Sequence, residues 1–581
     1  MKNYTTDITN VLVIGCGGAG LRSAIEVKKK GLSVKVLGKR PKSDAHTVLA
    51  AGGINASFGN LDAEDNWLCH FSDTYLEGYE IGDPQIIEIM TKKSPELVDE
   101  IDSWGANFAK LDDGKMNQRY FGAHTYRRTC FAGDYTGQAI LNALLKKSTE
   151  LKIPIFDSQY VFDLLIHEKS CFGAVSINII NGEITVHLAD AVILCSGGHT
   201  RIWSKSSSRN QENTGDGYHL ALKAGCSLID MEMVQFHPTG MILPTEFAGT
   251  LVTEAVRGEG GKLFNGNGER FMINYDKKRL ELSTRDKVAI ANYTEIEKGR
   301  STPNGGVYLD ISHKDKDFII EKIPKIYRQF IDLQMLDITK SPMEVAPTAH
   351  YSMGGIKVSS DEHSTEISGL FAAGEVAGGL HGANRLGGNS LAEILVFGKS
   401  SGNAAVEFSR NLTCKTRSLD VIRDSIDNIF RHLKKGDEIV NMIQYDLREL
   451  MWENCGVVRN KYKLNEGIKK LNQLKLRSER VDVRVSDNNF QDLINLLDLE
   501  ASLISAESTI KSALAREESR GSHYRSDFPM ISKEGKYNLN TTYKNNSLTV
   551  KKIACKNLNA ELNEYVKKHK QLDDLTGKLI E

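Results

Sequence analysis

The sequence has little of what membrane-spanning, secreted or metal-binding proteins need. None of its apolar stretches approaches the roughly 20 residues of a membrane-spanning helix. Its nine cysteines are scattered and no two stand in CxxC spacing, which argues against a disulfide framework, a zinc site or an iron–sulfur cluster within the chain. The opening residues MKNYTTDITN lack the apolar core of a signal peptide. We therefore expect a cytoplasmic protein that has no metal site of its own.

The sequence also lacks an excess of either charge. It contains 74 lysines and arginines against 75 aspartates and glutamates in 581 residues. This balance gives no global reason to expect nucleic acid or an anionic membrane as a partner. The length favours several domains and sets no limit on the size of the core.

What the sequence does contain, close to its start, is a pattern typical of dinucleotide binding. An apolar run at 11–14 is followed by GCGGAG at 15–20 and then by a helical pattern. A strand, a glycine turn and a helix in this order let the backbone approach a pyrophosphate at the helix N-terminus. The acid that usually ends the second strand is missing, because Leu37 is followed by Gly38 and Lys39. NAD is therefore less favoured than the glycine motif alone suggests.

Further glycine turns follow predicted strands. Residues 153–195 have the apolar pattern of several strands, and the last of them runs into Ser196-Gly197-Gly198. Such a turn is suited to lie against a cofactor. Thr214-Gly215-Asp216-Gly217 opens a predicted helix, where the acid either accepts a hydrogen bond from a ribose hydroxyl or simply caps the helix.

The pattern changes twice after residue 240. A loop-rich stretch with polar clusters predicts an inserted capping domain, and glycine-rich motifs return behind it. A later stretch with charged residues and helical spacing predicts a helical bundle. We predict an α/β fold with a two-piece Rossmann-like domain (1–240 and 346–410), an α+β capping domain (241–345), a helical domain (411–525) and a small C-terminal region (526–581) with weak strand signals and a final helix.

Eight motifs, in order, resemble those of one family: the flavoprotein subunits of succinate dehydrogenase and fumarate reductase, with L-aspartate oxidase as a near relative. The motifs are GCGGAG, AHTVLAAGGI, QFHPTG, LVTEAVRGEGG, TRDK, HYSMGGI, AAGEVAGGLHGANRLGGNSLAE and AREESRGSHYRSDFP. One such match would be weak evidence, whereas eight in register are strong. The resemblance covers roughly residues 1–530 and implies an FAD-binding domain in two pieces around a capping domain, in agreement with the segmentation above.

The resemblance implies a site for fumarate or succinate. Two carboxylates need several cations or hydrogen-bond donors, or desolvation would prevent binding. The family pattern assigns them to His237, Thr253, His350 and Arg385, of which Arg385 can grip a carboxylate with two bonds. A lone histidine is more often structural than a ligand, but both of these stand in motifs that match the family.

The resemblance also implies how the proton moves. Hydride passes between flavin N5 and one substrate carbon, and Arg285 donates or accepts the proton at the neighbouring carbon, connected to solvent through Glu254 and Arg257. Arginine is a surprising acid because its ordinary pKa is above about 12, so it needs burial among cations and a relay. From the residues alone, an ion pair of Arg285 with Asp286 or another acid is the simpler interpretation.

The cofactor implied by the resemblance is FAD. In the family, the histidine at the position of His46 is bonded through a ring nitrogen to the isoalloxazine methyl group, which raises the flavin potential. The alternative is a histidine that packs beside noncovalent FAD. The expected contacts are Gly15, Gly17, Gly18, Ala19, Gly20, Lys39, His46, Thr47, Gly52, Gly53, Asp216, Glu375, Ser390 and Leu391.

The first functional hypothesis is a flavoprotein subunit of fumarate reductase or succinate dehydrogenase. Because the chain has no cysteine cluster of its own, the resemblance implies that its electron partner is an iron–sulfur protein subunit, leading to quinone or, in thiol-linked fumarate reductases, to thiols. It also leaves open an indirect, peripheral attachment to the inner face of the cell membrane through other subunits.

Two alternatives remain open from the sequence. L-aspartate oxidase would need an acid for the substrate ammonium, and residues 118–128 contain none. The segment between His237 and Glu254, with extra residues at 243–247, is nevertheless longer than in the membrane-complex enzymes. In this respect the sequence resembles L-aspartate oxidase or an atypical fumarate reductase. The other alternative is a flavin-bound scaffold or assembly protein without turnover.

Overall fold

The computed structural model describes residues 4–486, 489–532 and 534–576. Its largest sheet has seven strands. The strand order of this sheet is β6-β2-β1-β9-β8-β7, and β16 pairs with the second half of β9. The outer strands are β6 (Ile155–Phe156), β7 (Gln159–His167) and β8 (Ser170–Asn178). The parallel strands β1 (Thr5–Ile14), β2 (Val34–Leu37), β9 (Ile184–Leu194) and β16 (Leu370–Ala372) end in register. Glycine turns that are far apart in the sequence therefore meet at one edge of the sheet.

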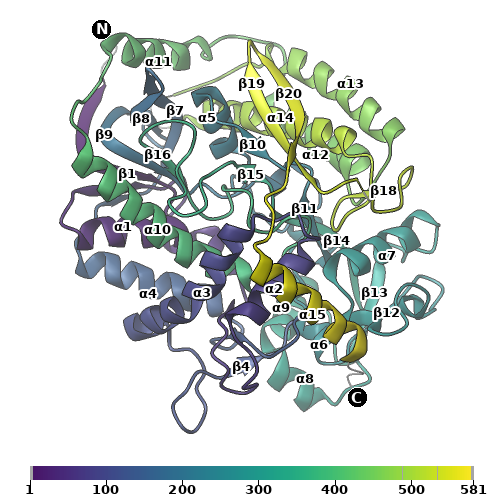
Figure 1. The fold of residues 1–581 in the computed structure, drawn as a ribbon. Helices are drawn as coiled ribbons and strands as arrows, with labels where there is room; N and C mark the ends of the chain where they lie inside the picture. The colour runs from purple at the N-terminus through teal and green to yellow at the C-terminus, as the bar shows by residue number, and fades with distance from the viewer. Residues whose placement is uncertain (1–3, 487–488, 533, 577–581) are drawn as a thin grey trace.

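Two helices cover this sheet on one side and lie along each other (Figure 1). Helix α1 (Gly18–Lys29) follows the first glycine turn, and α10 (Asn389–Asn411) begins just after the last one. A Cβ at Gly398 would approach Ala19 O to 2.8 Å, so glycine allows the two helices to pack closely. This packing sets the N-termini of both helices beside the same sheet edge.

Gly20 offers a direct test of how closely α1 packs on the glycine turn and on β1. A Cβ there would collide with Gly15 O and touch Val13 Cγ1 at 3.2 Å. We expect Gly20→Ala to destabilise the protein by about 1–3 kcal/mol, since overpacked sites cost this much, and to lower the FAD bound after purification. Thermal unfolding and flavin absorbance measure both. Gly258→Ala is the control, because a Cβ there meets no described atom within 4 Å; equal losses in both variants would contradict the packing argument.

A second, antiparallel sheet joins the cap to the rest of the molecule. Its order is β11-β14-β13-β12, formed by β11 (Val234–Met241), β14 (Met343–Ser352), β13 (Val307–Asp310) and β12 (Lys262–Phe264). The predicted limits of the capping domain, 241 and 345, fall inside β11 and β14. The strands that carry His237 and His350 are therefore continuous with the cap sheet.

The helical part contains α11 (Leu419–Arg431), α12 (Val440–Cys455), α13 (Lys461–Ser478) and α14 (Gln491–Ala515). Their apolar faces share one buried core with β7, β8 and β9 of the large sheet. No helix among the described residues is both long and apolar enough to cross a membrane.

The C-terminal region returns to the body of the molecule. Strands β19 (Tyr537–Lys544) and β20 (Ser547–Ala554) pair as a hairpin, and β19 adds to β10 (Leu228–Ile229). Helix α15 (Ala560–Thr576) then lies beside α2 (Trp67–Glu77), as Figure 1 shows. His569 Nε2 of α15 is 2.8 Å from Asp73 Oδ1 of α2. The α/β fold class and the helical part predicted from the sequence are confirmed.

Candidate active site

One cavity of about 1930 Å³ extends from the glycine turns at the sheet edge to the cap. It exceeds the roughly 300–1,000 Å³ of pockets that hold a single drug-sized ligand. Its volume is consistent with a dinucleotide together with a smaller second molecule. The lining includes all the residues predicted to bind cofactor or substrate or to move the proton, except Gly20, which packs α1 against β1 instead.

The sheet edge provides the features that a dinucleotide needs. Helix α1 points its N-terminus into the cavity, and its first turn carries no acidic residue to oppose a phosphate. Gly18 N donates to Thr47 Oγ1 at 3.0 Å, which fixes this turn against the segment that follows β2. Asp216 begins α5 (Asp216–Ala224) and Glu375 follows β16, so both predicted acids line the cavity. Burial raises the pKa of both carboxyl groups.

Lys39 occupies the place where an acid was missing from the sequence. Its Nζ lies 2.5 Å from Asp498 Oδ1 and 3.9 Å from Asp216 Oδ2. Asp498 belongs to α14 in the helical part, is 2% exposed and also accepts from Thr214 Oγ1 at 3.0 Å. The helical part therefore contributes to the cofactor end of the cavity. No local pattern could reveal Asp498, because it is 459 positions away from Lys39.

His46 lies in a short 3-10 turn, and its Nδ1 is 3.1 Å from Glu212 Oε2. Burial disfavours the charged imidazole, but the hydrogen bond and charge of Glu212 outweigh it and raise the pKa of His46. Arg209 holds Glu212 in turn, with its Nε 3.1 Å from Glu212 Oε1. Because Nδ1 is engaged, Nε2 is the nitrogen available to a ligand in the cavity. Glu212 stands in no recognised motif and could not be predicted from the sequence.

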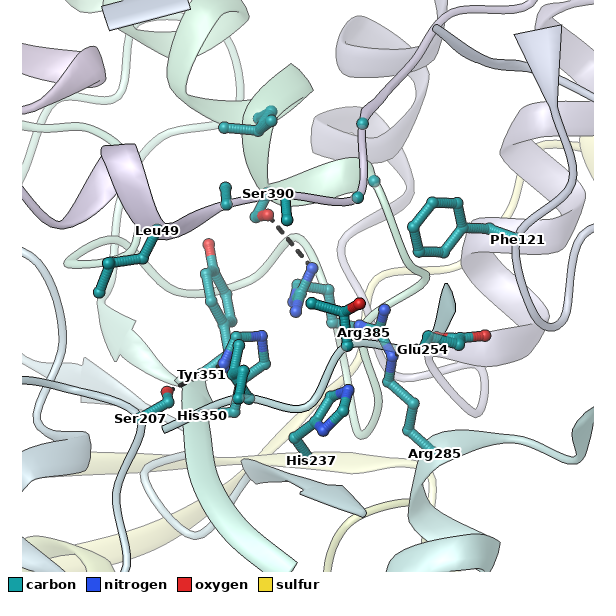
Figure 2. Close-up of a pocket in the computed structure, with 18 of the residues that line it drawn as sticks. Leu49, Phe121, Ser207, His237, Glu254, Arg285, His350, Tyr351, Arg385 and Ser390 are labelled. Carbon is teal, nitrogen blue, oxygen red and sulfur yellow. Dashed lines mark hydrogen bonds and ion pairs between the residues drawn. The ribbon is translucent and has the colours of Figure 1, made fainter. Parts of the chain in front are cut away.

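At the cap end, side chains from five segments converge (Figure 2). His237 comes from β11, His350 from β14, and Arg285 is the first residue of α7 (Arg285–Glu297). Arg385 precedes α10, and Glu254 precedes the short helix α6 (Ala255–Gly258). Thr253, the neighbour of Glu254 in the sequence, also lines the cavity.

Both histidines are held neutral. Burial and the charges of Arg285 and Arg257 keep the pKa of His237 well below its usual range. Burial and Arg385 do the same to the pKa of His350. The two rings lie edge to face with centroids 5.6 Å apart, and His350 Nδ1 is 3.0 Å from Ser207 Oγ. Two neutral imidazoles can therefore hydrogen-bond an anion that the arginines attract.

Arg285 is paired with Glu254. Its Nε donates to Glu254 Oε2 at 2.9 Å, whereas Asp286 accepts from Tyr79 and Asn384. Arg257 Nη2 is 3.9 Å from the same Glu254 oxygen. Burial favours the neutral acid, but Arg285 and Arg257 together lower the pKa of Glu254 to about 2. The predicted Arg285–Glu254–Arg257 set is thus contiguous, and the acid that pairs with Arg285 is Glu254 rather than Asp286.

Arg385 lies over the Tyr351 ring, 4.3 Å from its centroid. Burial and the charge of Arg285 lower its pKa to about 10, which leaves it protonated at neutral pH. Its Nε is buried and finds no hydrogen-bond partner among the described residues. A buried guanidinium that lines a cavity and has one unsatisfied donor is well suited to a carboxylate ligand.

Several residues of this region escaped the sequence analysis. Gln235 bridges the two arginines, Tyr351 supports Arg385, and the ring centroid of Phe121 lies 5.9 Å from the Arg285 guanidinium. Gly122 N donates to Glu254 Oε1 at 3.0 Å. Gln235 and Tyr351 stand inside recognised motifs, so the signal was present but had not been assigned to them. Phe121 and Gly122 lie in the loop at 118–128, which contains no acid but contacts Arg285 and Glu254.

Comparison with known proteins places this site in a family. The FAD binding domain family matches residues 10–391, and the C-terminal family of the fumarate reductase flavoprotein matches residues 444–570. One fumarate reductase (CoM/CoB) subunit of Methanothermobacter marburgensis is 44% identical over 530 residues, covering 91% of this chain and 96% of that protein. The succinate dehydrogenase flavoprotein subunit of Rickettsia conorii is 37% identical over 547 residues, covering 90% of each.

Solved structures agree. The structure of Mycobacterium smegmatis Sdh1 in complex with UQ1 has a TM-score of 0.88 and 36% identity, covering 95% of each chain. A quinol-fumarate reductase with menaquinol molecules has a TM-score of 0.90 and 32% identity, covering 95% of this chain and 99% of that one. The resemblance drawn from the eight motifs is confirmed. The chain therefore belongs to the family of FAD-dependent oxidoreductases formed by the flavoprotein subunits of fumarate reductase and succinate dehydrogenase.

Proposed function

We propose that this chain interconverts fumarate and succinate, with Arg285 as the proton donor or acceptor. The observation that carries the proposal is the convergence of two guanidinium groups and two neutral histidines at the cap end of the cofactor cavity. A dianion fits this end because cations and donors replace its hydration. Bound FAD would supply the hydride donor or acceptor at N5.

The carboxylates are held by Arg385, His237, His350 and Thr253. The buried Nε of Arg385, without a partner among the described residues, supports a carboxylate ligand there. Fixing both carboxylates directs the two central carbons, so that hydride reaches one of them and a proton the other. Burial of the site keeps water from competing for these donors.

Arg285 moves the proton. In the reductive direction its guanidinium gives a proton to the carbon next to the one that receives the hydride, and in the oxidative direction it takes a proton from that carbon while the neighbouring carbon loses the hydride. Glu254, ionised and 2.9 Å from Arg285 Nε, is placed to pass the proton on to or from Arg257. The fully buried Arg257, whose Nη1 donates to Glu281 O at 2.6 Å, extends the relay away from the substrate.

FAD is held at the sheet edge and covalently through His46 Nε2. The engagement of Nδ1 by Glu212 supports this choice of nitrogen. Glu212 would also stabilise positive charge on the substituted ring, as its effect on the His46 pKa indicates. The two pieces of the predicted dinucleotide domain and the cap between them would enclose the flavin.

The covalent link predicts a fluorescent band. After denaturing electrophoresis, the purified wild-type chain should show flavin fluorescence, and His46→Ser should lose it while still binding FAD before denaturation. His432→Ser, at a histidine that pairs with Glu500 outside the cavity lining, should keep the signal. A dark wild-type band from protein with bound FAD would remove the covalent claim but leave the reaction untouched.

Electrons are exchanged with an iron–sulfur protein subunit. The absence of any CxxC pair in the sequence supports a separate partner, and among the described residues no cluster of metal-binding side chains occurs. The similarity to a protein named fumarate reductase (CoM/CoB) supports thiols as the final donor, and the similarity to Sdh1 supports quinone. Purification from the native source, followed by assays with thiol and with quinol, separates the two. An indirect, peripheral attachment of the cytoplasmic chain to the membrane would run through the iron–sulfur subunit or through further subunits.

L-aspartate oxidase is the weaker candidate. The extra residues at 243–247 lie outside the cavity lining, with Phe247 44% exposed, so they do not reshape the substrate site. Glu77 of α2 does line the cavity, but burial and the charge of Asp286 raise its pKa well above the ordinary value. A neutral carboxyl group is poorly suited to hold a substrate ammonium. Iminoaspartate formation from aspartate would overturn this ranking.

A further inference from the structure

We infer that Gln235 is a positioning residue that holds Arg285 and Arg385 in their working geometry, and that Asn384 fixes Gln235 in turn. This inference rests on the proposed function, because it assumes that the two arginines act on the substrate. It goes beyond that function by giving roles to two amide side chains to which the proposed reaction assigns none.

Gln235 lies between the two guanidinium groups. It is completely buried in β11. Its Oε1 is 3.0 Å from Arg385 Nη2 and 3.5 Å from Arg285 Nη1, and so accepts from both arginines. Its Nε2 donates to Asn384 Oδ1 at 2.8 Å and to Arg385 O at 2.9 Å. One amide therefore contacts both cations and also the backbone of one of them.

The chemistry of the neighbours fixes the orientation of both amides. If Gln235 were turned over, its NH2 group would face two guanidinium groups that can only donate. If Asn384 were turned over, its oxygen would face a carboxyl oxygen of Asp286, and its NH2 group would face the NH2 group of Gln235. In the observed arrangement Asn384 Nδ2 is 2.6 Å from Glu77 Oε1 and 3.2 Å from Asp286 Oδ1. Both amides thus have one favourable orientation.

The chain of amides ties together the segments that carry the arginines. Asn384 precedes Arg385 in the sequence, and Asp286 follows Arg285 at the start of α7. Ser522 completes the set by donating to Asn384 Oδ1 at 3.2 Å. Ser522 belongs to the AREESRGSHYRSDFP motif, whose purpose the sequence did not reveal. Hydrogen bonds between these distant segments therefore hold the two guanidinium groups in one placement.

A neutral amide suits this position better than an acid. Two guanidinium groups close together repel each other, and an oxygen that accepts from both offsets the repulsion. A carboxylate would do so as well, but it would cancel one positive charge and compete with the dianionic substrate for the same donors. Glutamine bridges the arginines and leaves both charges available to the substrate.

The test compares Gln235→Met and Gln235→Glu in the FAD-loaded chain, with fumarate reduction by an artificial electron donor. Met removes the bridge without adding charge, so we expect kcat to fall by about 10²-fold, as misplaced catalytic groups do, with a smaller change in KM. Glu keeps the bridge but adds charge, so we expect KM to rise about tenfold or more and kcat to change less. Malonate is a dicarboxylate that binds without reacting, because it has no CH2–CH2 unit. In each variant its dissociation constant should change by about the same factor as KM.

Asn384→Leu provides a second, independent test. It removes the side-chain partner of Gln235 Nε2, so it should reproduce part of the kcat loss, and its effect should not add to that of Gln235→Met. Gln444→Met is the matched control, because this amide bonds to Asn495 O in the helical part and lies outside the cavity lining. Its kinetics should equal those of wild type.

Two results would overturn the inference. One is wild-type kinetics in both Gln235 variants and in Asn384→Leu. The other is that Gln235→Met and Gln235→Glu change kcat by the same factor and KM by the same factor, and both lose flavin absorbance. That result would indicate a merely structural role for Gln235. A wild-type chain without fumarate or succinate turnover would instead contradict the proposed function, so the two failures are distinguishable.

Discussion

Replacing Arg285 by leucine should lower kcat for fumarate reduction by roughly 10³-fold or more while FAD stays bound. General acid–base catalysis by a placed group contributes about 10²–10⁴-fold. The substitution also removes one of the cations that face Glu254, whose pKa is held at about 2 by Arg285 and Arg257 against the opposing effect of burial. The pKa of Glu254 should therefore rise in the variant, and the relay behind it should weaken.

Steady-state assays in both directions measure this loss, with flavin absorbance as the check on cofactor content. Arg423→Leu is the control, because Arg423 is exposed in the helical part and its pair with Asp420 lies on the surface. We expect it to retain wild-type turnover. Arg285→Lys should recover only a small part of the activity, since lysine lacks the planar fork that reaches both Glu254 and Gln235. Turnover within tenfold of wild type in Arg285→Leu would refute the role of Arg285.

The parts of the fold that the sequence predicted are those with strong local patterns. The apolar run at 11–14, the glycine turn and the helix behind it form β1 and α1, and the spaced leucines at 493–499 lie in α14. The glycine turns could be expected to meet because parallel strands end at one edge of a sheet. The pairing of β19 with β10 could not, because a two-residue strand such as β10 carries no recognisable pattern.

The same division holds for the site. His237, His350, Arg285 and Arg385 stand in long motifs, and the structure brings all four together. Their partners are set by packing between distant segments, which local sequence does not encode: Glu212 at His46, Asp498 at Lys39. Such partners determine the protonation state and the orientation of the side chains in the motifs. The structure adds this information to what the motifs predict.

The second large effect is expected at Arg385. Arg385→Met removes the guanidinium that lies over Tyr351 and that has a buried Nε free of partners among the described residues. Removing one partner of a buried charge pair costs about 2–5 kcal/mol, so we expect kcat/KM for fumarate to fall by roughly 10²–10⁴-fold, mostly through KM. Arg385→Lys should restore charge but not the two parallel bonds, and should lie between wild type and Met.

The loss should also depend on pH, with a sign that the structure determines. In the wild type, burial and the charge of Arg385 hold the pKa of His350 well below its usual range, so its imidazole is neutral. Without Arg385 the pKa of His350 should rise, although burial, His237 and Arg285 still lower it. Protonation of His350 as the pH falls would then supply a cation for the carboxylate. We expect the kcat/KM of Arg385→Met, divided by that of wild type, to increase as the pH is lowered below neutrality. A ratio of variant to wild type that stays constant over this range would show that His350 does not compensate, and equal malonate affinity in both proteins would show that Arg385 does not bind the carboxylate.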